Sequence, residues 1–263
     1  MKARLTQKEF YNSKKEKQSK LNKLWGIIRT KYQGPGTPFR EHYINILKNF
    51  LGELREKKVL EFGIGPNHPV SFYIAENCKE YTVVDLSKKR LERYEEKLRA
   101  HNIRNVKYIV GDIMKVNLPF NQYDVVVGLG VVHHLEDIRK AMYRIRDFLR
   151  VEGYTVFADP LNTEPLIMFL RFVSRPLRPN LMWEFPLETK EINIIKSIFP
   201  ENEIVYMNAL SKLAFPFAFL PFSTHTFHRI FDILNSADIK ILKYPFFQRF
   251  AWQVAIKAIK CNV

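Results

Sequence analysis

The chain has 263 residues, of which 46% are hydrophobic and 26% charged, and its formal net charge is +15. This balance is that of a folded globular protein and excludes wholesale disorder. The longest apolar runs, DVVVGLGVV and LAFPFAFLPF, reach about half of the ~20 residues that a membrane-spanning helix needs, and the lysine-rich start lacks the apolar core of a secretion signal. We therefore expect a cytoplasmic protein whose positive surface attracts anionic partners.

The first part of the chain predicts helices that precede the main fold. Lysines and arginines dominate before residue 30, which is typical of a solvated cationic helix or tail. The stretch YQGPGTP then ends one helix, and apolar residues between Phe39 and Leu54 recur at steps of three and four. This spacing indicates an amphipathic helix packed on a core, so we assign residues 1–57 to an N-terminal helical extension.

From residue 58 onward, short runs rich in β-branched and aromatic residues alternate with helical segments. The predicted strands are KVLEFG, EYTVVDLS, VKYIVGD, YDVVVGLG and GYTVFADP. Strands that are apolar at nearly every position and alternate with helices predict a parallel sheet covered on both faces. Residues 58–160 are therefore expected to form a Rossmann-like, doubly wound α/β core.

The alternation stops after Asp159 and resumes near the end of the chain. There the sequence predicts a helix at FHRIFDILNSA, a short strand at IKILKYP and a final strand at AWQVAIKAIK. We expect residues 161–224 to be a cap inserted after the fifth strand, at the edge where open α/β sheets bind ligands. Residues 225–263 are expected to complete a seven-stranded sheet with the last helix and two strands.

A glycine turn follows the first predicted strand. The segment VLEFGIGPN places Glu61 two residues before Gly63, and Gly65 follows. Such a turn binds either a dinucleotide or another adenosine-bearing cofactor. The dinucleotide pattern needs a third glycine where this chain has His68 followed by Pro69, so we favour the other cofactor class.

Four segments in order, LEFGIGPN, VVDLS, VGDIM and YDVVVGLGVVHHLED, resemble the motifs of the class I S-adenosylmethionine-dependent methyltransferases. The resemblance implies that S-adenosylmethionine is the cofactor; we expect no metal. One position departs from the family, because Asn67 stands where the family has its third glycine. Asparagine tolerates the left-handed backbone conformation better than most side chains, so the turn remains compatible with cofactor binding.

The resemblance also implies which residues hold the cofactor. Gly63 and Gly65 let the backbone approach it, and Glu61 supports the turn and the methionine ammonium. Asp85, at the end of the second strand, accepts hydrogen bonds from both ribose hydroxyls. Helix capping is the alternative for this acid, although Ser87 fills that role better. The remaining candidates, which border the adenine or the methionine portion, are Leu86, Asp112, Ile113, Leu129 and Gly130.

Two histidines, His133 and His134, are candidates for catalysis. They lie at the start of the helix predicted after the fourth strand, near the point where the methyl group leaves sulfur. A histidine there can act as a general base at neutral pH. Because the family carries a histidine here even where no base is needed, a structural role is the favoured interpretation.

The inserted segment is expected to select the acceptor. Its turn after the fifth strand resembles a bacterial small-molecule, type 11-like methyltransferase group, and its apolar lining suits a small lipophilic or aromatic acceptor. Candidate contacts are Trp183, Glu184 and Phe217. The phenylalanines of LAFPFAFLPF could instead complete a hydrophobic core, or could join the cations in a peripheral contact with an anionic membrane surface.

The favoured hypothesis is a methyltransferase that acts on a small molecule by direct SN2 transfer. The charge of +15 keeps an RNA methyltransferase as an alternative. Nucleic acid is the less favoured partner, because the sequence lacks a recognisable RNA-binding module and its fourth strand ends in GLGVVHH rather than an NPPY-type tetrapeptide. A non-catalytic protein that binds S-adenosylmethionine or nucleic acid is the third alternative.

Overall fold

The computed structural model describes residues 30–65, 69–164, 168–169, 172–173, 187–218 and 224–262. Their strands are β1 (Lys58–Phe62), β2 (Glu80–Asp85), β3 (Val106–Val110), β4 (Tyr123–Leu129), β5 (Leu149–Pro160), β6 (Asn202–Met207) and β7 (Gln253–Ile259). The α-helices are α3 (Pro38–Leu51), α4 (Pro69–Asn77), α5 (Lys88–Ala100), α6 (Ile138–Phe148), α8 (Thr189–Ile198), α9 (Thr224–Ile241) and α10 (Pro245–Gln248). Two 3-10 helices are η1 (Val132–His134) and η4 (Ser211–Ala218).

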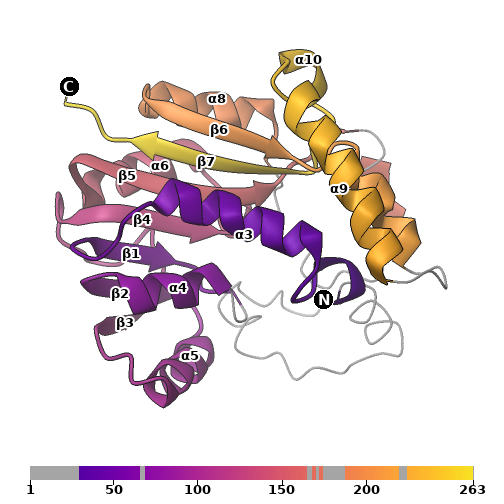
Figure 1. The fold of residues 1–263 in the computed structure, drawn as a ribbon. Helices are drawn as coiled ribbons and strands as arrows, with labels where there is room; N and C mark the ends of the chain where they lie inside the picture. Colours follow the sequence, from indigo (N-terminus) through magenta and orange to yellow (C-terminus); the bar gives the residue numbers. More distant parts are fainter. Residues whose placement is uncertain are drawn as a thin grey trace, which may run out of the picture.

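The seven strands form one sheet in the order β3-β2-β1-β4-β5-β7-β6 (Figure 1). Strands β1 to β5 pair in parallel, and β7 runs antiparallel between β5 and β6. The chain moves outward from β1 through β2 to β3 and then returns to place β4 on the other side of β1. The predicted fold class, a doubly wound Rossmann-like α/β sheet of seven strands, is confirmed.

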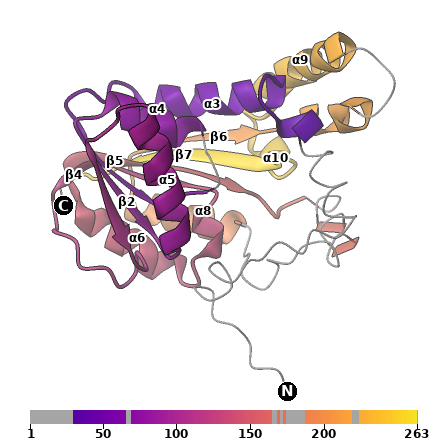
Figure 2. The same ribbon diagram turned by 90° about the horizontal axis from the view of Figure 1, so that it is seen from below.

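Helices cover both faces of this sheet (Figure 2). On one face, buried residues of α3, α4 and α5 pack with alternate strand residues such as Val59. On the other face, α6 and α8 pack against the intervening residues such as Leu60. All residues of the central strand β4 are buried, which explains its uninterrupted apolar sequence.

Helix α3 has the limits that its sequence suggests. Thr37 caps its start, where the Thr37 side chain accepts a hydrogen bond from the Arg40 N–H at 3.4 Å, and Pro38 occupies the first turn. Gly52 ends the helix with a φ of 62°. Between these ends the apolar stripe, including Leu47 and Leu51, is buried against the sheet.

Of the last two predicted strands, the final one is confirmed and the one before it, IKILKYP, is wrong. Residues 239–241 of the expected strand IKILKYP form the end of α9, and the chain then turns into α10. The sixth strand is Asn202–Met207, which lies inside the segment assigned to the cap. There Ile204 and Tyr206 pack on one face of the sheet, while Val205 and Met207 pack on the other. This alternation makes the segment a strand of the core.

Helix α8 also belongs to the core rather than to a cap. Its buried residues Ile192, Ile195 and Ile198 share one hydrophobic cluster with Met142 and Ile145 of α6. The sheet and its helical layer therefore take up residues 187–207, and the boundaries predicted at 161–224 are too wide. Residues 1–29, which hold most of the N-terminal lysines, lie outside the described residues.

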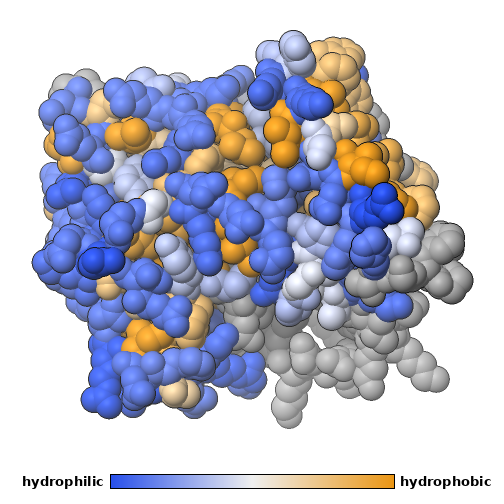
Figure 3. Space-filling view, in the orientation of Figure 1, coloured by the Kyte–Doolittle hydropathy of each residue, from blue (hydrophilic) through white to orange (hydrophobic). Residues whose placement is uncertain are grey.

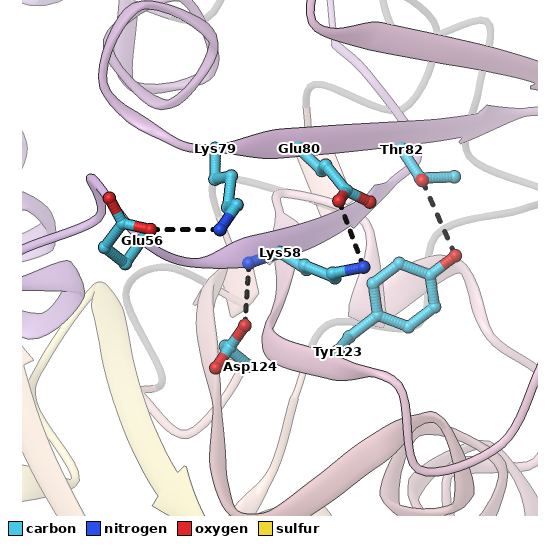
Figure 4. Close-up of polar contacts among 7 residues, drawn as sticks. All are labelled: Glu56, Lys58, Lys79, Glu80, Thr82, Tyr123 and Asp124. Carbon is cyan, nitrogen blue, oxygen red and sulfur yellow. Dashed lines mark hydrogen bonds and ion pairs between the residues drawn. The ribbon is translucent and has the colours of Figure 1, made fainter.

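At the amino-terminal edge of the sheet, charged side chains form ion pairs with one another and a hydrogen bond with the main chain (Figure 4). Asp124 accepts a hydrogen bond from the main-chain N–H of Lys58 at 2.7 Å, and the Lys58 ammonium lies 3.0 Å from the Glu80 carboxylate. Lys79 and Glu56 form a further ion pair at 3.1 Å. These groups serve strand pairing, which leaves the acids at the opposite edge as the candidates for chemistry.

Candidate cofactor and acceptor site

The candidate site lies at the carboxyl edge of the sheet, around β1 and β4. These neighbouring strands pair in parallel, and the chains that leave them lead to opposite halves of the sheet. A crevice at such a reversal is where open α/β sheets bind ligands. The ends of β1, β2, β4 and β5 bring Glu61, Gly63, Asp85, Gly130 and Asp159 to this edge.

Gly63 is required by the geometry of the turn after β1. Its φ is +69°, its N–H donates to the Val84 carbonyl at 2.8 Å, and a β-carbon there would lie 2.2 Å from Val131 Cγ2. A β-carbon at Gly65 or Gly130 would meet no heavy atom of the described residues within 4 Å. Among the described residues nothing fills the space beside these two glycines, which is compatible with a bound cofactor.

Glu61 is a buried acid beneath this turn. Its carboxylate accepts hydrogen bonds from Ser71 Oγ at 2.6 Å and from the Tyr81 hydroxyl, so it connects β1 to α4 and β2. Burial raises the pKa of Glu61 to about 7, against the opposing effect of these two hydrogen bonds. The structure thus shows Glu61 linking β1 to α4 and β2, while its support of the turn and its contact with a methionine ammonium stay predictions.

Asp85 ends β2 as a buried carboxylate, with 4% of the residue exposed. Its Oδ1 accepts the Ser87 N–H at 2.7 Å, and its Oδ2 lies 4.0 Å from the Arg90 guanidinium. Desolvation raises the pKa of Asp85, and the N–H groups of Ser87 and Ile64 together with Arg90 oppose that rise. Because Ile64 follows Gly63, this carboxylate lies directly beside the glycine turn.

Asp112 caps its own turn after β3. Its Oδ1 accepts the Met114 N–H at 2.9 Å, and its carbonyl accepts the N–H groups of Lys115 and Val116. The adjacent Ile113 is buried, and Leu86 is half-buried directly after Asp85. Asp112 thus serves its own turn in the structure, and its contact with adenine stays a prediction.

At the end of β4, Leu129 is buried and the Gly130 N–H donates to the Ala158 carbonyl at 2.7 Å. This hydrogen bond fixes the start of the segment that leads to the two histidines. Pro66, Asn67 and His68 of the glycine turn lie outside the described residues, as do Trp183 and Glu184. The predictions on these residues stay untested.

His133 is held by Asp159, a residue that the sequence did not single out. Asp159 Oδ1 lies 2.6 Å from His133 Nδ1 and accepts the His133 main-chain N–H at 3.1 Å. Asp159 Oδ2 is buried and has no hydrogen-bond partner among the described residues. Both histidines lie in η1, with ring centroids 4.0 Å apart, and α6 begins only after its N-cap Asp137.

A further hydrophobic cluster lies where the end of the N-terminal extension, η4 and α9 meet. It joins Tyr32, Phe39, Phe227 and Phe231, and the half-buried Phe217 packs against it. The structure thus brings the end of the N-terminal extension, η4 and α9 together. This placement matches the alternative in which Phe217 completes a hydrophobic core, and its contact with an acceptor stays a prediction.

A buried ion pair lies beside this cluster. Lys212 Nζ is 3.2 Å from the Glu164 carboxylate, with each side chain 10% exposed, and also donates to the Phe250 carbonyl at 2.9 Å. It connects the segment after β5 to η4 and to the residues before β7. No spacing along the chain links this pair, because the two residues are brought together only by the fold.

The sheet order, the glycine turn after β1 and the acid at the end of β2 define the class I S-adenosylmethionine-dependent methyltransferase fold. Residues 60–157 match the family model described as a methyltransferase domain. The chain therefore contains a methyltransferase domain of this class, and the family resemblance seen in the sequence is confirmed. The described residues contain no group of three or more histidine, cysteine or acidic side chains placed to hold a metal, and none of their helices is long and apolar enough to cross a bilayer.

A curated relative is the uncharacterized methyltransferase YcgJ of Bacillus subtilis strain 168. It is 22% identical over 155 residues, which cover 58% of this chain and 59% of YcgJ. The match thus spans less than two thirds of that relative. The crystal structure of YcgJ resembles this chain with a TM-score of 0.56 and 17% identity, over 85% of this chain and all of that one.

Two solved structures with known ligands share the fold. Phosphoethanolamine N-methyltransferase 2 of Haemonchus contortus, with phosphomonomethylethanolamine and S-adenosylhomocysteine, has a TM-score of 0.61 and 20% identity, over 94% of this chain and 59% of that one. Geranyl diphosphate C-methyltransferase of Streptomyces coelicolor A3(2), with Mg²⁺, geranyl diphosphate and S-adenosylhomocysteine, has a TM-score of 0.59 and 12% identity, over 84% and 80%.

Proposed function

We propose that the chain transfers a methyl group from S-adenosylmethionine to a small-molecule acceptor. The observation that carries the proposal is the buried Asp85 carboxylate beside the glycine turn, in a chain that contains a methyltransferase domain. When bound, S-adenosylmethionine would supply a methyl group on a sulfonium: the acceptor nucleophile would bond to the methyl carbon in a single SN2 step as the carbon–sulfur bond breaks, and S-adenosylhomocysteine would leave. The protein then has to hold the cofactor, align the acceptor and exclude water.

Each part of the cofactor has a proposed partner. Asp85 accepts hydrogen bonds from the ribose hydroxyls, because it is the buried acid at the end of β2. Glu61 supports the turn against the methionine portion, and Asp112 receives the adenine amino group. The residues that border the ring and the methionine chain are Leu86, Ile113, Leu129 and Gly130.

The proposed acceptor is small and lipophilic or aromatic. The nearly uninterrupted apolar stretch LAFPFAFLPF in the segment after the fifth strand supports this proposal. The two structural neighbours with known ligands also support a small-molecule acceptor. One is named as an N-methyltransferase and the other as a C-methyltransferase. Trp183, Glu184 and Phe217 are the proposed contacts.

The pair His133–Asp159 suits two roles. If the acceptor is a hydroxyl, Asp159 holds the Nδ1 side of His133 and leaves Nε2 to accept the proton, the arrangement of an oriented general base. If the acceptor is an amine or a carbanion, no base is needed and the pair fixes the loop after β4. His134 is the second candidate base because it lies beside His133 in η1.

Calorimetric titration with S-adenosylhomocysteine tests the cofactor proposal. Asp85→Asn is expected to weaken binding by about 10- to 100-fold, because hydrogen bonds to a charged group contribute about 1.5–3 kcal/mol. The exposed acid Asp232 of α9 provides the control variant Asp232→Asn, which should bind as the wild type does. Wild type that binds NAD but not S-adenosylhomocysteine would overturn the proposal.

The acceptor class needs a separate measurement. Small-molecule acceptors and transfer RNA are compared for turnover of radiolabelled S-adenosylmethionine. RNA binding with a steep salt dependence and no turnover of small molecules would favour the nucleic-acid alternative. Binding of the cofactor without any turnover would favour a non-catalytic protein.

A further inference from the structure

The corner between α9 and β7 exposes several large apolar side chains. Ile239 is 55% exposed, Tyr244 64%, Phe246 61% and Phe247 37%. Single exposed hydrophobic residues are ordinary, whereas a group this dense on one turn of chain marks an interaction surface. We call residues 239–250 the corner.

The corner also carries positive charge without any acid. Lys240, Lys243 and Arg249 are exposed, and residues 239–250 contain no aspartate or glutamate. The Arg249 guanidinium lies 5.0 Å from the ring centroids of both Phe246 and Phe250. Figure 3 shows hydrophobic and hydrophilic side chains side by side over α9 and α10.

The nearest acid in sequence adds no exposed negative charge. Asp238 is 2% exposed and accepts the N–H groups of Leu210 at 2.6 Å and Ser211 at 3.0 Å. These hydrogen bonds fasten the end of α9 to η4. The corner is therefore held in place by the fold and needs no ordering before it meets a partner.

The corner and the residues that follow it are hydrogen-bonded to the segment after β5. The Thr163 hydroxyl donates to the Arg249 carbonyl at 2.8 Å, and the Leu161 N–H donates to the Trp252 carbonyl at 2.9 Å. In Figure 1, α10 projects beyond the end of α9. A flat partner can thus reach the corner while it stays connected to the carboxyl edge of the sheet.

We propose that the corner docks on the surface of an anionic lipid bilayer. Tyr244, Phe246 and Phe247 enter the interface, and the three cations meet lipid phosphates. A second copy of the chain is a poor occupant, because a symmetric contact would oppose the same cations. RNA fits less well, because single strands are bound in grooves and the corner projects. The proposal goes beyond methyl transfer and does not depend on it.

Co-sedimentation of the full chain with vesicles of phosphatidylcholine and phosphatidylserine tests the proposal. The wild type should bind these vesicles and not pure phosphatidylcholine. Phe246→Ala/Phe247→Ala should weaken binding at least tenfold. The control Tyr143→Ala, at an exposed tyrosine of α6, should leave it unchanged.

Charge variants separate the corner from the overall charge. Lys240→Glu/Lys243→Glu should weaken vesicle binding at least tenfold, since each cation near an anionic surface contributes about fivefold. Lys107→Glu/Lys196→Glu makes the same change of net charge at exposed positions elsewhere and should have a small effect. An equal loss of vesicle binding in the two double variants would overturn the proposal. It would also be overturned if the wild type failed to bind vesicles but bound RNA, and the corner variants abolished that RNA binding. Unchanged thermal unfolding and S-adenosylhomocysteine affinity in the corner variants will show that folding is intact.

Discussion

One carboxylate oxygen of Asp159 holds His133 twice, at 2.6 Å from the ring Nδ1 and at 3.1 Å from the main-chain nitrogen. The two residues come from the ends of neighbouring parallel strands, β5 and β4. The ring is thus fixed at the edge where the cofactor motifs meet. Whether this contact serves catalysis or only the fold can be separated by experiment.

Asp159→Asn is expected to lower the free energy of unfolding by about 1–3 kcal/mol, because a buried hydrogen-bonded charge is replaced by an amide with a misplaced donor. Urea unfolding measures this loss. If His133 is also a base, methyl transfer to a hydroxyl acceptor should fall and its pH profile should change, while S-adenosylhomocysteine affinity stays the same. Asp232→Asn, the same exchange at an exposed acid of α9, is the matched control. A destabilised variant with an unchanged rate and pH profile would assign the pair to structure alone.

Glu61→Gln should change how the stability depends on pH. In the folded chain burial raises the pKa of Glu61 to about 7, above its ordinary value of 4.5. Its protonated form is therefore favoured by folding, so this contribution is complete below about pH 4.5 and is lost as the pH rises through 7. As the pH rises from 4.5 to 8, the free energy of unfolding of the variant should therefore increase relative to that of the wild type by up to about 3 kcal/mol. The measurement is urea unfolding without cofactor at both pH values, and a constant difference would contradict the raised pKa.

Two glycine variants should separate folding from cofactor binding. Gly63→Ala places a β-carbon at 2.2 Å from Val131 at a positive φ, and should cost about 2–4 kcal/mol of stability. Gly65→Ala meets no heavy atom of the described residues within 4 Å and should fold normally, yet it should weaken S-adenosylhomocysteine binding if the turn borders the cofactor. Thermal unfolding and calorimetry together measure both effects. A Gly65 variant that binds the cofactor as tightly as the wild type would place the ligand elsewhere.

Lys212→Met should cost about 3–5 kcal/mol of stability, because it removes the ammonium that lies 3.2 Å from the buried Glu164 carboxylate. The double variant Lys212→Met/Glu164→Leu should recover most of this loss, since it removes both charges. The exposed pair Lys88–Glu92, at 3.6 Å, provides a control in which Lys88→Met costs under about 1 kcal/mol. Single and double variants of equal stability would show that the pair is not coupled.

The first five strands could be predicted from the sequence because they are apolar at nearly every position and separate clear helices. Strand β6 was missed, since NEIVYM is half-buried and carries polar residues typical of a sheet edge. At IKILKYP the sequence predicts a strand that does not form. A short alternation of apolar and polar residues suggests a strand there, although α9 continues through Ile241.

The site was predictable to the extent that it depends on strand ends. Motif residues such as Glu61 and Asp85 follow directly from the order of strands, because the carboxyl ends of parallel strands share one edge. The partners Asp159 for His133 and Lys212 for Glu164 could not be found in this way. They come from segments that meet only after the chain has folded, and no local spacing links them.

Strand β7 has a further consequence for how the molecule is made. It follows the other described strands along the chain, yet it lies between β5 and β6 and supplies both with hydrogen bonds. During synthesis, β6 cannot join the growing sheet until residues 253–259 have emerged from the ribosome. Until then β5 presents an unpaired edge, so the nascent protein passes through a stage that is exposed to aggregation and to capture by chaperones.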